Sequence, residues 1–197
     1  MTNSLASQAG AVRLRPGKRE RLVAAAIRLL HEQGSERTTL ADIAKEADVP
    51  AGNVYYYFKT KDEVIAAAID AHAHQIKATL TAIEGRHRSP KSRLKALVRE
   101  LGGQSDLVAQ YGCPLGSLCS ELDKRGPASG LDVAVLMRLP VDWAQEQFRA
   151  LGRRDARDLA FDLLAAYEGS ALLANTLHDP AVLTSAAKRI EKWIDTL

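Results

Sequence analysis

The sequence predicts an all-α fold. Apolar residues recur with the 3.6-residue period of an α-helix wherever a pattern can be read, and no alternating run bounded by turn residues indicates a β-strand. Apolar residues make up 46% and charged residues 26% of the 197 positions, a composition typical of globular proteins, so disorder along the whole chain is excluded. A chain of this length builds one or two domains with buried cores.

The first helix is predicted over residues 18 to 33, where apolar residues share one face and Gly34 is placed to stop the helix. A second, short helix begins after Thr39, whose hydroxyl can cap it together with Asp42 three residues on. This helix ends at a tight turn over residues 48 to 50.

Two further helices follow the turn. In the brief helix over residues 51 to 58, Val54 and Phe58 form the i, i+4 apolar pair suited to a core. Residues 60 to 63 read Thr-Lys-Asp-Glu, a capping box, and open a helix whose apolar stripe continues to Gly85. This fourth helix is long enough to link two units of structure.

Beyond residue 85 the predicted helices are separated by Pro and Gly. Pro suits the first turn of the helices that open at residues 89, 113 and 179, whereas Pro140 is expected to kink or split the helix that contains it. The predicted helices cover residues 89 to 102, 113 to 124, 129 to 151, 155 to 175 and 179 to 197.

Positive charge is concentrated near the first residues of the chain. The formal net charge is +3, from 27 Lys and Arg against 24 Asp and Glu. Residues 1 to 21 carry a net +4, residues 22 to 61 are neutral, and residues 62 to 197 carry −1. A basic arm before a folded domain indicates contact with a polyanion, and a solvated tail is the alternative interpretation.

Neither a membrane segment nor a disulfide framework is indicated. No apolar run reaches the ~18 to 20 residues that cross a bilayer, and residues 1 to 20 lack the apolar stretch of a signal peptide, so we expect a cytoplasmic protein. Cys113 and Cys119, six residues apart on a helix, point about 240° away from each other, and we expect reduced thiols.

Three consecutive tyrosines, Tyr55, Tyr56 and Tyr57, occupy the helix over residues 51 to 58. Successive helical residues are 100° apart, so three in a row cannot share one buried face. With the apolar pair of this helix turned to the core, at least one or two tyrosines must project outward. Such exposure indicates a surface that a partner uses.

The same helix has a small front edge, because it begins with Ala51, Gly52 and Asn53. Two short helices joined by a tight turn are typical of the helix-turn-helix, whose second helix enters the major groove of DNA. The Asn53 amide can pair with adenine. Hydroxyl and ammonium groups suited to phosphate oxygens come from Thr39, the three tyrosines, Lys59 and Lys61. The alternative is an ordinary helical hairpin with exposed tyrosines.

Residues 39 to 61, TLADIAKEADVPAGNVYYYFKTK, resemble the DNA-binding signature of the TetR family of bacterial transcriptional regulators, and the resemblance extends over residues 18 to 69. It implies a recognition helix at residues 51 to 56. It assigns phosphate contacts to Thr39, Tyr55, Tyr57 and Lys61 and base contacts to Ala51, Gly52, Asn53 and Tyr56. Two residues depart from the family pattern: Asp48 stands where Gly is usual, and Pro50 replaces a Ser that would cap the recognition helix.

The resemblance also implies a ligand pocket and a dimer interface in the C-terminal part. We expect a flexible basic arm at residues 1 to 17, a helix-turn-helix DNA-binding domain at 18 to 61 and a helical ligand-binding and dimerisation domain at 62 to 197. The expected dimer contacts are the small residues Ala160, Ala165, Gly169 and Ala171 and the apolar residues Leu164, Leu172, Ile190 and Ile194. Burial of these residues within one subunit is the alternative.

Residues 111 to 118, YGCPLGSL, resemble a motif at the same place in one subset of the family, where a short helix borders the pocket. Candidate pocket residues are Tyr111, Cys113, Leu115, Met137, Trp143, Phe148 and Tyr167, although such residues at helical spacing are more often plain core. Cys113 at a helix N-terminus suits a redox or electrophile sensor if the helix dipole lowers its pKa; a buried, inert thiol is the alternative.

Taken with the resemblance, these features predict a homodimeric transcriptional regulator that binds a (pseudo)palindromic operator in double-stranded DNA, with repression relieved by an unidentified small-molecule effector. No cofactor, metal site or catalytic residue is expected, because His72 and His74 point about 200° apart on a helix and neither a phosphate-binding loop nor a Gly-x-Ser-x-Gly turn is present. The alternatives are a helical ligand-binding or protein-interaction module without DNA binding, and a thiol-based sensor.

Overall fold

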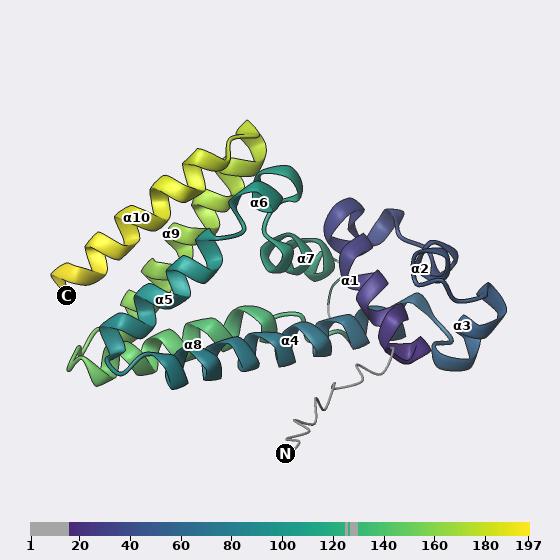
Figure 1. Ribbon diagram of the computed structural model, residues 1–197, viewed down its shortest axis with the longest axis horizontal. Coiled ribbons are helices and arrows are strands. Elements are labelled where there is room, and N and C mark those ends of the chain that lie inside the picture. Colours follow the sequence, from purple (N-terminus) through teal and green to yellow (C-terminus); the bar gives the residue numbers. More distant parts are fainter. Residues whose placement is uncertain (1–15, 125, 127–129) are drawn as a thin grey trace, which may run out of the picture.

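The computed structural model describes residues 16–124, 126 and 130–197, and every regular element within them is an α-helix, which confirms the all-α prediction (Figure 1). No helix in these ranges is both long and apolar enough to cross a bilayer. The helices are α1 (Lys18–Arg37), α2 (Leu40–Glu46), α3 (Ala51–Tyr57), α4 (Lys61–Arg86), α5 (Pro90–Gly102), α6 (Ser105–Tyr111), α7 (Pro114–Asp123), α8 (Val135–Ala150), α9 (Ala156–Leu177) and α10 (Pro180–Thr196).

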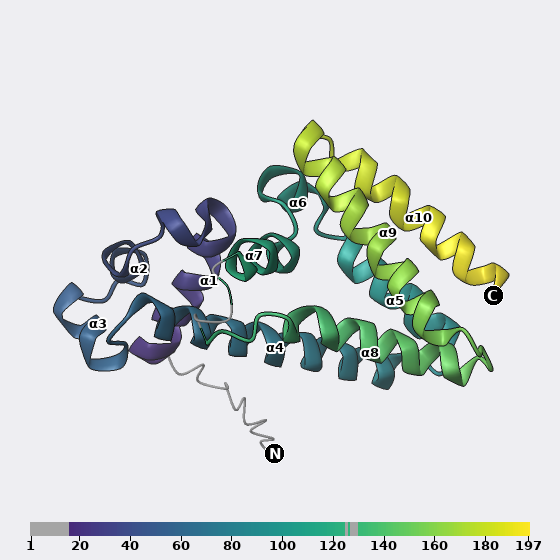
Figure 2. The same ribbon diagram turned by 180° about the vertical axis from the view of Figure 1, so that it is seen from behind.

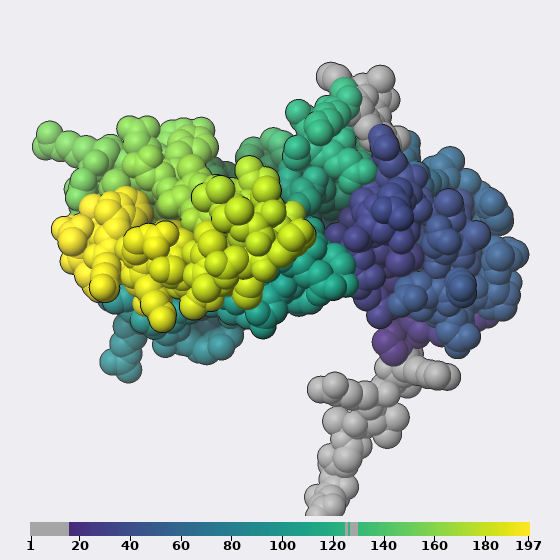
Figure 3. All heavy atoms as spheres, turned by 90° about the horizontal axis from the view of Figure 1, so that it is seen from above, coloured from purple at the N-terminus to yellow at the C-terminus, as the bar shows by residue number. Residues whose placement is uncertain are grey.

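The first three helices gather at one end of the molecule, and α4 leads away from them alongside α8 (Figures 1 and 2). α10 packs against α5 and α9 on the other side of the fold. Figure 3 shows the first helices, in purple and blue, and the last two, in yellow-green and yellow, at opposite ends of the molecule.

Two main apolar cores correspond to these two ends. The first combines buried residues of α1 to α4 with Leu118 and Leu122 of α7 and Leu136 of α8. The second combines buried residues of α5, α6, α8, α9 and α10. Leu115 of α7 packs against both cores. α7 is therefore the short helix that connects them.

Gly34 interrupts α1 at the position where the sequence predicts that the helix stops. Its backbone has φ 81° and ψ 169°, a combination that is essentially open to glycine alone. The helix resumes for one turn beyond it, so the N–H groups of Ser35 and Glu36 point out of the break rather than back along α1.

Side-chain caps define the helix starts. Thr39 and Asp42 form the predicted reciprocal capping box at α2. The box predicted for α4 is formed in part: Thr60 Oγ1 accepts from the Glu63 amide at 3.2 Å, but the Glu63 carboxylate accepts from the Lys59 amide at 2.7 Å instead of from residue 60. The Glu63 carboxylate therefore binds the backbone N–H of Lys59, one residue before the N–H that a capping box would bind.

The helices differ from the sequence prediction in two places. The helix α6 was not expected, because its seven residues lie between glycines and its N-terminus has no side-chain cap. α8 begins at Val135 rather than near residue 129, which lies outside the described residues, and Pro140 does not split it. Pro140 lies early in α8, where its missing N–H removes a single bond from the helical ladder.

The expected dimer seam was wrong for most of its residues. Those buried within the subunit are Ala160, Leu164, Ala171, Ile190 and Ile194. Leu172 is exposed, and so are Ala165 and Gly169. α9 is apolar on two faces, one of which packs into the second core, and helical periodicity does not reveal which face is which.

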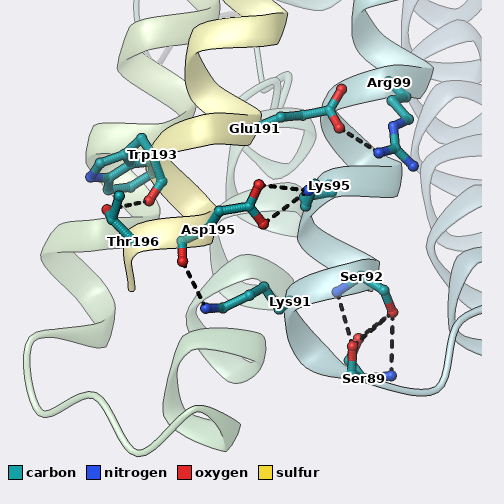
Figure 4. A network of polar contacts seen from close by, with 9 residues as sticks. All are labelled: Ser89, Lys91, Ser92, Lys95, Arg99, Glu191, Trp193, Asp195 and Thr196. Carbon is teal, nitrogen blue, oxygen red and sulfur yellow. Dashed lines mark hydrogen bonds and ion pairs between the residues drawn. The ribbon is translucent and has the colours of Figure 1, made fainter.

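α10 is fixed along α5 by ion pairs (Figure 4). Lys95 Nζ lies 2.8 Å from Asp195 Oδ2, and Arg99 pairs with Glu191 at 2.5 Å. Such partly exposed pairs each contribute little free energy, so the buried apolar face of α10 supplies most of the stability, and the ion pairs set its alignment. This packing commits one side of α10 to α5.

Gly34→Ala should lower the free energy of unfolding by about 1 to 3 kcal/mol, because a Cβ at this φ and ψ is strained and would lie 3.1 Å from Glu121 Oε2. Gly85→Ala is the matched control. Gly85 lies within α4 with no atom within 4 Å of an added Cβ, so this change should stabilise the protein by up to about 1 kcal/mol. Urea unfolding followed by circular dichroism measures both; equal changes in the two variants would contradict the role of Gly34.

Candidate DNA interface and C-terminal cavity

α3 presents its tyrosines while its apolar pair anchors it. Val54 and Phe58 are buried in the first core, and Tyr55 and Tyr56 are 55% and 81% exposed. Tyr57 is half-buried, with its ring edge-on to Tyr56 at a centroid distance of 5.0 Å. The prediction that at least one or two tyrosines project outward is confirmed.

The front edge of α3 is open. Ala51 and Gly52 are exposed, Asn53 is half-buried, and no atom lies within 4 Å of a Cβ placed on Gly52. Pro50 occupies the N-cap position, where no side-chain hydrogen bond is made, as the departure from the family pattern predicts. A flat macromolecular surface can therefore approach the backbone at the start of α3.

The turn between α2 and α3 is held by α1. Asp48 adopts φ 50°, the left-handed conformation that Asp tolerates, as predicted. The Arg21 guanidinium donates to the carbonyl oxygens of Ala47 at 2.9 Å and Asp48 at 3.1 Å, and Val49 is buried. The Arg19 guanidinium also lies over the Phe58 ring at 5.2 Å. These contacts set the angle at which α3 leaves the turn.

Three polar groups assigned to phosphates have partners within the protein. The Thr39 hydroxyl donates to Asp42 Oδ2 at 2.6 Å, and this bond chiefly lowers the pKa of Asp42. Lys59 Nζ donates to the Tyr55 carbonyl oxygen. Lys61 is half-buried and donates to the Ser35 carbonyl oxygen at 2.8 Å. Lys61 thus faces the end of α1, whereas Thr39 and Lys59 remain exposed.

The break in α1 is bound by a carboxylate from α7. Glu121 accepts from the Ser35 amide at 2.8 and 2.9 Å, from the Ser35 hydroxyl at 2.8 Å and from the Glu36 amide at 3.0 Å. Burial alone would raise the pKa of Glu121, but these donors and the nearby Lys61 ammonium outweigh it and lower the pKa. The carboxylate is charged at neutral pH and ties α7 to the end of the molecule that carries α2 and α3.

A second contact joins α1 to the segment between α6 and α7. His31 Nε2 donates to the Gly112 carbonyl oxygen at 2.9 Å, and the His31 ring lies edge-on to Tyr111. The sequence analysis did not identify His31 or Glu121 as functional residues. Gly34 signalled a break, but no sequence pattern connects it with a residue 87 positions later.

The sequence model of the family "Bacterial regulatory proteins, tetR family" matches residues 22–68. An HTH-type transcriptional regulator in the lacX 3′ region of Lactococcus lactis subsp. lactis is 30% identical over 183 residues, covering 85% of this chain and 88% of that protein. The chain belongs to the TetR family. The HTH-type transcriptional regulator BetI of Burkholderia ambifaria is 27% identical over 187 residues, covering 94% of this chain and 96% of BetI.

The fold of this TetR-family chain matches solved structures of the family. The crystal structure of a TetR transcriptional regulator from Legionella pneumophila superposes with a TM-score of 0.81. The superposed region covers 92% of this chain and 98% of the Legionella pneumophila chain at 22% identity, so the likeness extends through the C-terminal helices. The N-terminal helix-turn-helix and the C-terminal helical domain predicted from the sequence are confirmed.

The C-terminal helices of this TetR-family chain form a cavity of about 550 Å³ behind α7, open to solvent on one side. Residues of α7, α8 and α9 line it together with the segment between α6 and α7. Cys113 and Met137 from the predicted set lie in its wall. Glu168 and Asn175 also lie in the wall. The sequence analysis did not predict them, because it considered mainly apolar and aromatic residues as pocket candidates.

The other predicted pocket residues do not line this cavity. Phe148 is fully buried against Trp193, and Tyr167 is buried in the same core. Trp143 donates from its indole N–H to Glu84 at 2.8 Å. Tyr111 contacts His31, and Leu115 packs between the two cores. Five of the seven candidates therefore lie outside this cavity, and Leu115, Phe148 and Tyr167 among them belong to the apolar cores.

Cys113 does not have the properties of a reactive thiol. Burial, with the nearby Glu168 carboxylate, raises its pKa to about 12. Its Sγ donates to Glu168 Oε1 at 3.2 Å and accepts from the Gly116 amide at 3.4 Å. Burial also raises the pKa of Cys119 to about 11, and both cysteines are free thiols in the structure. In the described ranges, no group of three or more His, Cys, Asp or Glu side chains could hold a metal ion.

Glu121→Gln should lower the free energy of unfolding by about 1 kcal/mol at pH 7, because the amide cannot accept all three hydrogen bonds. The folded-state pKa of Glu121 lies below its unfolded value of about 4.3, so its contribution is present above that pH and is lost as the pH falls through the folded-state pKa. Thermal unfolding measured from pH 7 downward should therefore show the stabilities of the unmodified protein and the variant converging. Glu146→Gln, at an exposed carboxylate on α8, is the control and should change stability little at any pH.

Proposed function

We propose that this TetR-family transcriptional regulator is a homodimeric repressor that binds a (pseudo)palindromic operator in double-stranded DNA and leaves it when a small molecule binds. The observation that carries the proposal is the exposure of Tyr55 and Tyr56 on a helix anchored by buried residues. Exposed aromatic side chains next to an open helix edge cost solvation free energy unless a partner covers them.

In this proposal α3 enters the major groove. Asn53 pairs with a base, and Ala51, Gly52 and Tyr56 lie against base edges. Phosphate oxygens accept from Tyr55 and Tyr57 and, after exchange of their present partners, from Thr39, Lys59 and Lys61. Contacts to phosphate position α3 on the duplex, and contacts to bases supply sequence preference.

The division of labour follows the chain. Residues 18 to 61 bind DNA, and residues 62 to 197 bind the effector and the second subunit. The basic arm at residues 1 to 17, including Arg13 and Arg15, adds phosphate contacts; residues 1–15 lie outside the described residues. An arm of this kind would raise affinity for all DNA sequences, because it contacts only the backbone.

The second subunit binds at the outer face of α9. This helix holds four of the seven large apolar residues that are exposed in the described ranges: Phe161, Leu172, Leu173 and Leu177. Ala165, Ala166 and Gly169 lie among them and allow another helix to approach closely. A dimer carries two α3 helices, about one helical turn of DNA apart (~34 to 36 Å). Two half-sites then supply the sequence specificity that the seven residues of a single α3 lack.

Release uses α7. One face of α7 lines the cavity, and its opposite face packs into the first core through Leu118 and Leu122. A ligand that favours a displaced α7 would act on α1 through Glu121 and on the adjoining α4, and would thereby change the separation of the two recognition helices.

The full-length protein should bind a fragment of the DNA upstream of its own gene in a gel-shift titration, with an affinity that falls steeply as the salt concentration rises. Asn53→Ala should weaken binding to the preferred site by about 10- to 100-fold and reduce the preference over other sequences. Tyr55→Phe should weaken binding to every sequence by about 2- to 10-fold, because one phosphate contact is lost.

Absence of a salt-sensitive specific complex with any tested fragment would contradict DNA binding and favour a helical ligand-binding module. Equal and uniform losses from the two substitutions would contradict the roles assigned to Asn53 and Tyr55.

Leu173→Glu should convert the dimer to a monomer in sedimentation-velocity measurements at micromolar concentration, because it places a charge in the apolar α9 face. Leu107→Glu, on the equally exposed surface of α6, is the matched control and should leave the dimer intact. A monomeric unmodified protein, or dissociation caused only by the α6 variant, would contradict the α9 interface.

A further inference from the structure

The cavity behind α7 combines an apolar wall with a cluster of oxygen atoms. Met137 and Leu172 contribute apolar surface. Glu168, Ser117 and Asn175 contribute oxygens. The Asn175 amide nitrogen donates to the Ala109 carbonyl oxygen at 3.2 Å, and its Oδ1 lies on the Gly112 side of the cavity. The polar part of the wall is therefore rich in hydrogen-bond acceptors.

Glu168 is a half-buried charged group in this wall. It projects from α9 against Gly116 of α7, where an added Cβ would collide with Glu168 Oε2. Its hydrogen-bond donor among the described residues is the Cys113 thiol at 3.2 Å, a neutral and weak donor. Burial raises the pKa of Glu168. Lys124, the cation among the described residues of the wall, is exposed at its edge.

A half-buried carboxylate with one weak donor is stabilised by a cation that brings N–H groups. We propose that the effector of this protein is a primary or secondary alkylammonium compound, whose ammonium group binds Glu168 and whose hydrocarbon part lies against Met137 and against Leu172 at the mouth of the cavity, where the wall meets the outer face of α9. Asn175 Oδ1 and the Ser117 hydroxyl accept its remaining N–H groups. The inference rests on the ligand-release part of the proposed function.

The position of the ammonium site suits transmission to α1. Gly112 and Glu121 line the same cavity, and each also makes a hydrogen bond to α1. Gly116, against which Glu168 packs, and Glu121 belong to the same short helix. Drawing the Glu168 carboxylate toward a ligand changes its packing on α7, the helix that holds the break in α1.

Isothermal titration calorimetry of the full-length protein, without DNA, tests the ligand class with three probes that share one hydrocarbon chain: n-octylammonium, n-octanol and octanoate. We expect n-octylammonium to bind at least about tenfold more tightly than either of the others, because the charge-assisted hydrogen bond is available to it alone. Equal affinities for the three probes, or a preference for octanoate, would overturn the proposal.

Glu168→Gln should reduce the affinity for n-octylammonium at least about tenfold and leave the affinity for n-octanol unchanged. Gly116→Ala, which displaces the carboxylate but keeps the charge of the chain, should also weaken n-octylammonium binding. Asp162→Asn, at an exposed carboxylate on α9, is the control and should change neither affinity. Unchanged n-octylammonium binding by both the Glu168 and Gly116 variants would overturn the assignment to Glu168.

The two proposals fail separately. Loss of the ammonium preference with an intact, salt-sensitive complex on DNA refutes only the effector class. Ammonium binding that depends on Glu168, together with no complex on any DNA, supports the effector class and refutes the repressor.

Discussion

The arrangement of the two ends of the molecule depends on one carboxylate and one broken helix. Gly34 turns the backbone out of α1 and directs two amide N–H groups away from the helix, where water or an acceptor must satisfy them. Glu121 of α7 supplies that acceptor. Because the Lys61 ammonium binds the Ser35 carbonyl oxygen at the same place, the end of α1, the start of α4 and the end of α7 meet in one polar cluster. The orientation of the helix-turn-helix relative to the C-terminal helices follows from this cluster.

The features predicted correctly from the sequence are those set within a few residues. The α2 capping box, the break at Gly34, the left-handed Asp48 and the uncapped start of α3 each depend on local backbone chemistry. The exposed tyrosines followed from helical geometry alone, since their neighbours on either side are apolar.

The features that could not be predicted from the sequence depend on contacts between residues far apart in the chain. Nothing near Phe148 distinguishes a core aromatic from a pocket aromatic, because the distinction lies in Trp193 on another helix. Lys61 turns to Ser35 rather than outward for the same reason. The two apolar faces of α9 were indistinguishable until α8 and α10 were placed against one of them. Selecting pocket candidates by apolarity also passed over Glu168, which gives the cavity its chemical character.

The two-sided packing of α7 limits how modular this protein can be. In chain order the DNA-binding part that we propose ends near residue 61, but Leu118, Leu122 and Leu136 complete the core beneath it. A fragment cut at residue 61 would leave apolar surface of α1 uncovered. A chimaera that joined this helix-turn-helix to the C-terminal part of a relative would need that relative's α7 to fit the same core and to carry an acceptor opposite Gly34. Exchange of parts between family members is therefore constrained by a helix that lies far beyond the apparent boundary.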